Sequence, residues 1–103
     1  MVFRKIYILR QHSYQVVKLL GLEVDLLAHD CVRIASQENI VYFDPFKLEA
    51  DKVYKKANLI LISHEHYDHC SIDDLRKIVS PGTVIIASTQ CRESLSNMNV
   101  KEV

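Results

Sequence analysis

Short runs rich in hydrophobic and β-forming residues occur along the first half of the chain and are typical of strands. The segment Cys31–Ala35 shows this most clearly, because its side chains alternate between two sets as they would on the two faces of a sheet. Asp44-Pro45 closes the last of these runs, since proline cannot donate to a strand ladder. The expected strands are Leu22–Ala28, Cys31–Ala35 and Ile40–Phe43. Together they predict a meander at the beginning of a sheet.

The second half of the chain alternates apolar runs with helix-compatible segments. Leu59–Ile62 and Thr83–Ala87 contain no polar alternation, which predicts strands covered on both faces. Ser71, with Asp74 three residues later, predicts the capped start of a helix from Ile72 to about Val79. Strands that alternate with helices predict an α/β layered sheet. Further helices are expected at His12–Leu20 with Gly21 as its stop, at Lys47–Ala57, and from Ser88 or Thr89 to Leu95.

Composition narrows the classes of protein to be considered. The 103 residues allow one domain or part of a larger one, and 13 basic residues balance 13 acidic ones. A neutral chain has no net field to attract nucleic acid or an anionic membrane, so neither partner is expected. No run approaches the roughly 20 apolar residues of a membrane span, and Ile6–Leu9 is too short for a secretion signal. We therefore expect a cytoplasmic protein whose Cys31, Cys70 and Cys91 are small buried thiols.

A cluster of potential metal ligands follows the apolar run Leu59–Ile62 directly. His64, His66, Asp68 and His69 lie within six residues, and this segment holds three of the chain's five histidines. Imidazole nitrogens and carboxylate oxygens are the ligands that hydrolytic metal sites use. A solvated polar loop is the alternative, but so dense a cluster after a buried strand favours a metal site.

The spacing of the cluster predicts how it would work. Two residues that lie two apart emerge on the same face if strand geometry continues, so His64 and His66 can hold one ion. A turn in the loop would let Asp68 and His69 address a second ion about 3.5–4 Å away. A water between two such ions loses its proton near neutral pH and becomes the nucleophile, and Asp68 could accept a hydrogen bond from that water. Glu65 and Tyr67 alternate away from the ligands.

The cluster matches the H-x-H-x-D-H motif of the metallo-β-lactamase superfamily. Its surroundings resemble the branch that contains L-ascorbate-6-phosphate lactonase-like proteins, which usually has Gly-His and Asp-Pro at the first two matching places. Alanine replaces that glycine here. The resemblance covers about residues 22–103, and residues 1–21 look like an added N-terminal segment with a short helix. The segments that carry it are Ala28-His29-Asp30, Ile40–Phe46 and Ala57–His64.

The resemblance implies a role for each site residue. Two divalent ions, zinc or else manganese, would be held by His64 with His66 and by Asp68 with His69. Asp44 would hydrogen-bond to the metal loop from a neighbouring strand end, unless it only forms an ordinary Asp-Pro turn. His29 would approach the site, with a core or surface histidine as the alternative.

The family fold is a four-layer αββα sandwich of two similar halves, and this chain resembles the N-terminal half. In that family a third histidine, a bridging carboxylate and a last histidine follow downstream. Here no histidine follows His69, and Glu102 is the one carboxylate after Leu95. The absent second sheet would also leave an apolar face uncovered, which predicts a homodimer or a complementary C-terminal half as partner.

Two hypotheses of different classes follow from these observations. The first is a metal-dependent hydrolase that cleaves an ester, lactone or phosphoester bond of a small molecule, present as an incomplete N-terminal half. The second is a catalytically inactive half-domain that binds metal or self-associates, and the missing ligands favour it for the chain alone. A nuclease of the same superfamily is disfavoured by the zero net charge and the lack of a basic stripe.

Overall fold

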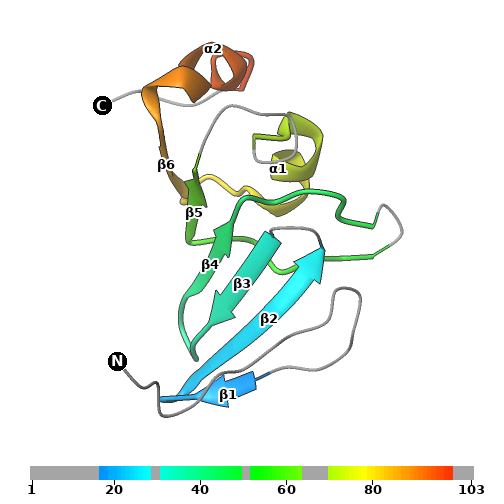
Figure 1. Cartoon of the computed structure of the whole chain (residues 1–103), viewed down its shortest axis with the longest axis vertical. Coiled ribbons are helices and arrows are strands. Elements are labelled where there is room, and N and C mark those ends of the chain that lie inside the picture. The colour runs from blue at the N-terminus through cyan, green and yellow to red at the C-terminus, as the bar shows by residue number, and fades with distance from the viewer. Residues whose placement is uncertain (1–16, 29–30, 50–51, 64–69, 99–103) are drawn as a thin grey trace, which may run out of the picture.

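A mixed six-stranded sheet forms the framework of the protein in the computed structural model, which describes residues 17–28, 31–49, 52–63 and 70–98 (Figure 1). The first four strands pair antiparallel, and the last three pair parallel. The expected strands from residue 22 onward are confirmed. In spatial as well as sequence order, the strands are β1 (Val17–Leu19), β2 (Leu22–Ala28), β3 (Cys31–Ala35), β4 (Ile40–Phe43), β5 (Leu59–Ile62) and β6 (Val84–Ala87).

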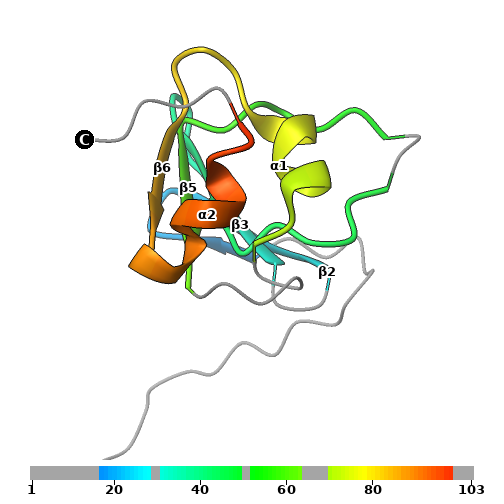
Figure 2. The same ribbon diagram turned by 90° about the horizontal axis from the view of Figure 1, so that it is seen from above.

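The helices pack on one side of the parallel part of the sheet, as Figure 2 shows for α1 (Ile72–Ile78) and α2 (Arg92–Leu95). A 3-10 turn, η1 (Thr89–Cys91), leads into α2. The expected cap of α1 is confirmed, because the Ser71 hydroxyl accepts a hydrogen bond from the Asp74 amide at 3.4 Å. One sheet with helices on one face is the arrangement of half of an αββα sandwich, so the expected fold class is confirmed. None of the helices in the described ranges is long and apolar enough to span a membrane.

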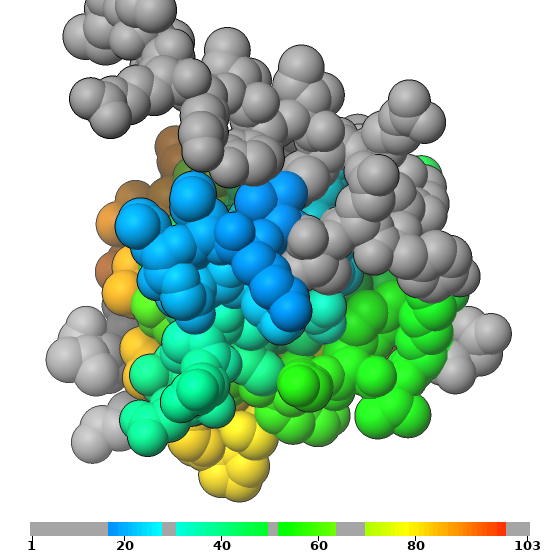
Figure 3. Space-filling view, turned by 90° about the horizontal axis from the view of Figure 1, so that it is seen from below, coloured from blue at the N-terminus to red at the C-terminus, as the bar shows by residue number. Residues whose placement is uncertain are grey.

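The chain enters the sheet through strand β1, so the helix expected over His12–Leu20 is wrong at its C-terminal end. The run Val17-Lys18-Leu19 alternates between the faces of the sheet, and this edge strand appears in blue in Figure 3. Leu20 and Gly21, with φ of 54° and 76°, form a two-residue turn into β2. Positive φ at both positions is the signature of a type I′ hairpin. A glycine at positive φ also ends many helices, which is why Gly21 suggested one. Residues 12–16 lie outside the described residues.

The second prediction that the structure contradicts concerns the segment between β4 and β5. A helix was expected over Lys47–Ala57, but none of residues 47–49 and 52–57 is helical. Its backbone bonds to other parts of the fold: the Leu48 amide donates to Asp74 Oδ1 at 2.9 Å. The buried Tyr42 hydroxyl in turn donates to the carbonyl of Lys55 at 2.7 Å. Leu48 is 4% exposed whereas Val53 is 100% exposed, so the apolar spacing does not produce one buried face.

The core lies between the helices and one face of the sheet. Tyr42 of β4 and Ile60 of β5 are fully buried there against Leu75 and Ile78 of α1. Their spacing in α1 places Leu75 and Ile78 on the same face of the helix. At ~25 cal/mol per Å² of apolar area, these contacts stabilise the position of α1 on the sheet.

The opposite face of the sheet is apolar throughout, and we call it the apolar face. Strand register and alternation place on it Val17, Leu19, Leu22, Val24, Leu26, Val32, Ile34, Val41, Phe43, Leu59, Leu61, Val84 and Ile86. Each of these side chains is at least partly exposed, and Val84 and Ile86 are each 56% exposed. No helix or strand of the described ranges covers this face. The non-alternating runs of β5 and β6 predicted that both faces of the sheet would be apolar, and the resemblance predicted that one of them would lack its covering sheet.

The three thiols are buried, as the sequence predicted. Burial raises the pKa of Cys31 from 9.0 to about 12, although a hydrogen bond with the Phe46 backbone opposes the shift. The folded state therefore favours the protonated thiol. Stability from this group is fully present below pH 9 and is lost as the pH rises from 9 towards 12.

We therefore expect the free energy of unfolding to fall by about 1 kcal/mol between pH 8 and pH 10 through Cys31 alone. Urea denaturation at both values would measure the change, with Cys31→Ala as the control because alanine cannot titrate. The difference between the two proteins removes the contribution of lysines and tyrosines. An equal fall in both proteins would contradict the assignment to Cys31.

Candidate metal site at the ends of β4, β5 and β6

The two residues that flank the metal motif in sequence are described by the structure. Ser63 at the end of β5 comes directly before His64, and the buried Cys70 comes directly after His69. His64, His66, Asp68, His69 and His29 themselves lie outside the described residues, so their roles remain predictions. In the part of the chain that the structure describes, no three His, Cys, Asp or Glu side chains gather as a metal-binding group.

Asp44 is the predicted site residue that the structure does describe. It follows β4, is 9% exposed, and accepts hydrogen bonds from the Ser63 amide and the Ser63 hydroxyl, both at 2.7 Å. Its own amide donates to the carbonyl of Leu61 at 2.9 Å. These contacts join the end of β4 to the end of β5, one residue before the motif begins. The sequence pointed to Asp44 through the resemblance, but it did not identify Ser63 as the partner.

The backbone of Asp44 adopts a conformation that few residues tolerate. Its φ of 46° lies in the left-handed region, where a Cβ atom crowds the following carbonyl. Aspartate is one of the few non-glycine residues found there, because its short side chain can bond locally. The conformation turns the chain at the end of β4 so that the carboxylate reaches Ser63.

Replacing Asp44 by alanine should lower the free energy of unfolding by roughly 2–4 kcal/mol. The variant loses both contacts to Ser63 and keeps a Cβ at positive φ without compensation. Ser63→Ala is the matched control, since it removes the hydroxyl contact and retains the amide; about 1 kcal/mol is expected. Urea denaturation measures both, and equal losses would show that the amide contact contributes nothing.

A groove of about 360 Å³ opens at this same edge of the sheet. Ligands of open α/β sheets bind beyond the carboxyl ends of the strands, where this groove lies. Its volume is within the range of roughly 300–1,000 Å³ that small-molecule sites occupy. Its walls are apolar except for Asp44, Ser63 and Ser88. The complete lining is Phe43, Asp44, Leu61, Ile62, Ser63, Ile86, Ala87 and Ser88.

Cys70, which follows the motif directly, is a poor ligand or nucleophile at neutral pH. Burial, and then the neighbouring Cys91, raises the pKa of Cys70 to about 12. The thiolate is the form that binds metal or attacks a substrate, so a protonated thiol does neither. Among the described residues, the polar groups at these strand ends are therefore the side-chain oxygens of Asp44, Ser63 and Ser88. The imidazoles remain those that the sequence predicts.

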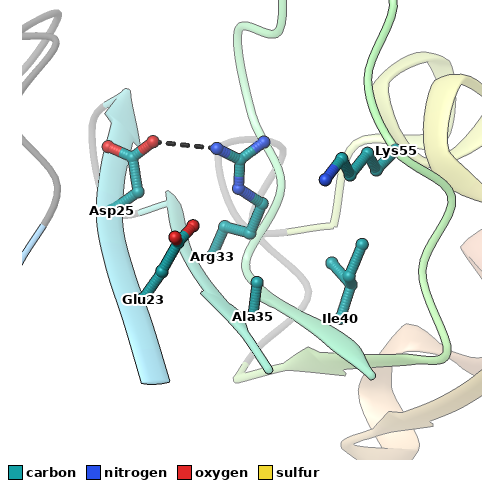
Figure 4. A pocket seen from close by; sticks show the side chains of 6 residues that line it. All are labelled: Glu23, Asp25, Arg33, Ala35, Ile40 and Lys55. Carbon is teal, nitrogen blue, oxygen red and sulfur yellow. Dashed lines mark hydrogen bonds and ion pairs between the residues drawn. The ribbon is translucent and has the colours of Figure 1, made fainter. Parts of the chain in front are cut away.

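A second pocket, of about 50 Å³, lies at the other end of β4 (Figure 4). Arg33 of β3 pairs with Asp25 of β2 at 2.9 Å, and the Lys55 side chain points towards the same pocket. The pocket also includes Glu23, so its two cations face two carboxylates. It is far smaller than the roughly 300 Å³ of ordinary small-molecule sites. The groove beside Asp44 is thus the better candidate site.

The comparisons with known proteins agree with this architecture. Residues 23–102 match the family described as the beta-lactamase superfamily domain. The fold is similar to a solved structure from Parabacteroides distasonis that is named as a metal-dependent hydrolase, with a TM-score of 0.73 and 24% sequence identity. The similarity covers 82% of this chain and 41% of that one, so the chain spans less than half the length of the matched structure. No curated protein matches the chain significantly.

Proposed function

The chain belongs to the beta-lactamase superfamily domain family, and from that premise we propose that it is the N-terminal half of a metal-dependent hydrolase. The substrate class is a small molecule with an ester, lactone or phosphoester bond. The observation that carries the proposal is the contact of Asp44 with both polar groups of Ser63 at 2.7 Å. It holds the residue before the motif beside a groove large enough for such a substrate.

The donor set of the motif fits divalent metal ions. Three imidazoles and one carboxylate are the ligand types that zinc prefers, and manganese accepts them too. We propose that His64 and His66 hold one ion and that Asp68 and His69 hold another. When bound, the ions would lower the pKa of a water molecule between them. Asp68 would accept a hydrogen bond from that water and orient it, and Asp44 would act only through Ser63.

Within the family, we propose that the chain is related to the lactonase-like branch. The segment that supports this assignment is Ile40–Phe46, which carries the Asp-Pro pair of that branch. In the structure this pair closes β4, and Pro45 is fully buried behind Asp44. A sugar-phosphate lactone is the substrate that this narrower assignment implies.

A second candidate function is a half-domain without catalytic activity. The described residues supply no additional group of metal ligands, and no histidine follows His69 in the sequence. Two protein ligands for each ion are fewer than a stable hydrolytic site uses. The chain by itself would then bind metal weakly and hydrolyse nothing.

We also propose that the apolar face packs against a second β-sheet, supplied by a complementary C-terminal half or by a second copy of the chain. Exposed apolar patches of more than a few hundred Å² are unusual on monomeric proteins. Sheets that pack face to face bury apolar side chains of this kind, about 10 Å apart. Such a second half would also provide the additional ligands.

A chimera tests the hydrolase function. In it, this chain replaces the matched part of the Parabacteroides distasonis protein, whose remaining residues supply the second half. Zinc-dependent hydrolysis of ester, lactone or phosphoester substrates is expected, and the same chimera with His64→Ala and His66→Ala should show none. A cooperatively melting, zinc-loaded chimera without hydrolysis of any of these substrates would favour the inactive half-domain.

A further inference from the structure

The second buried carboxylate near the motif belongs to Asp74, in the first turn of α1. It is 6% exposed and accepts hydrogen bonds from four donors on three parts of the chain. The donors are the Lys47 amide at 3.1 Å, the Leu48 amide at 2.9 Å, the Ser71 hydroxyl at 2.6 Å and the Lys77 ammonium at 3.3 Å. Nothing in the sequence pattern predicts the contacts to Lys47 and Leu48, which lie 27 and 26 residues away.

These contacts attach the helix that follows the motif to the segment 44–48. The same short segment begins with Asp44, which holds Ser63 on the other side of the motif. Lys77 strengthens the attachment, because its ammonium also donates to the carbonyl of Leu48 at 2.8 Å. Both ends of the motif, Ser63 before it and Ser71 after it, are therefore fixed to one five-residue segment.

We propose that Asp74 is a positioning residue for the metal motif, acting through Ser71 and the segment 44–48. This inference rests on the proposed metal site. Six consecutive residues, 64–69, carry the four predicted ligands, so the distance between Ser63 and Ser71 limits how those ligands can converge. Asp44 sets the position of one end and Asp74 sets the other. Residues that hold metal ligands in place typically change metal affinity by about 10–100-fold when they are replaced.

The carboxylate is well suited to this role. Its two oxygens offer about four acceptor sites, and the four donors use them. Hydrogen bonds to an ionised acceptor are roughly twice as strong as neutral ones. An asparagine at this position would keep one acceptor oxygen and place two N–H donors against donors of the loop, so it should release residues 47 and 48 while preserving the size of the side chain.

The test compares Asp74→Asn with Asp73→Asn, its exposed neighbour on the same helix. Zinc affinity is measured by competition with a chromophoric chelator, and the Co²⁺ absorption spectrum reports the arrangement of the ligands. Both are recorded at a temperature where thermal melting shows the proteins to be folded. Asp74→Asn should weaken zinc binding about 10–100-fold and change the Co²⁺ spectrum, whereas Asp73→Asn should match the wild type.

A second pair of variants covers the case in which Asp74→Asn does not fold. Ser71→Ala removes the hydroxyl that donates to Asp74, and Ser71→Thr restores a hydroxyl. Ser71→Ala should weaken zinc binding several-fold, and Ser71→Thr should recover it. Equal zinc affinity and identical Co²⁺ spectra in folded Asp74→Asn, or in Ser71→Ala, and the wild type would overturn the positioning role alone. A wild-type chain that binds no zinc would overturn the proposed metal site as well.

Discussion

Replacing His64 and His66 together by alanine is expected to abolish zinc binding by this chain. The two histidines provide half of the four predicted ligands, and both of those assigned to the first ion. A carboxylate and one imidazole would remain, which is too few for stable tetrahedral coordination. In the wild type we expect binding weaker than that of a complete site, because the chain offers two ligands for each ion.

Calorimetric titration with zinc measures this effect. His12→Ala is the control, since it also removes a histidine but leaves the motif intact. Ligation requires neutral imidazoles, so binding by the wild type should fade below about pH 6, near the intrinsic pKa of histidine. If the double variant and the wild type bound zinc equally, the assignment of the first ion would have to be abandoned.

Replacing Ile86 by aspartate should prevent the chain from associating through the apolar face. Ile86 lies on β6 next to Leu61 of β5, within this face, and is 56% exposed. Covering a few hundred Å² of apolar surface contributes several kcal/mol at about 25 cal/mol per Å². A charged side chain buried within such a contact would lose its hydration without a partner, so the association constant should fall by at least about 100-fold.

Light scattering coupled to size-exclusion chromatography measures the mass of the assembly. We expect a dimer or larger assembly for the wild type at micromolar concentration and a monomer for Ile86→Asp. Val53→Asp is the matched control, because Val53 is a fully exposed hydrophobic residue outside the sheet. A wild-type chain that is monomeric, folded and cooperative in thermal melting would show that the apolar face needs no partner.

The parts of the fold that the sequence predicted well are those in which local pattern and tertiary packing agree. The strands Cys31–Ala35, Ile40–Phe43 and Leu59–Ile62 have the expected bounds. Each is short, rich in β-branched residues and bounded by turn-forming residues. The helix Ile72–Ile78 also agrees, because Ser71 provides a local signal for its start.

The predictions that were wrong concern segments whose structure depends on contacts between residues far apart in the sequence. The segment 47–57 has helical spacing, but its described residues are not helical, and contacts with Asp74 and Tyr42 hold its Leu48 amide and its Lys55 carbonyl against other parts of the fold. Gly21 at positive φ fits a helix end and a hairpin turn equally well, and pairing of β1 with β2 decides between them. Tertiary context thus overrides propensity at both places.

In the candidate site, too, the sequence revealed the local features but not the contacts between distant residues. The motif was visible in the sequence because its four ligand residues lie within six positions. The contacts that hold its ends were not, since Asp44 and Ser63 are 19 residues apart and Asp74 and Leu48 are 26 apart. Only the pairing of β4 with β5 and the packing of α1 bring them together.

Zinc X-ray absorption spectroscopy of the zinc-loaded chain would identify the atoms that bind the metal. We expect nitrogen and oxygen ligands at about 2.0–2.1 Å with the outer-shell scattering of imidazole, and loss of that signal in the His64→Ala/His66→Ala variant. Sulfur ligands at about 2.3 Å would instead assign the metal to Cys31, Cys70 or Cys91. That result, or a chain that retains no zinc, would contradict a metal site built from the motif.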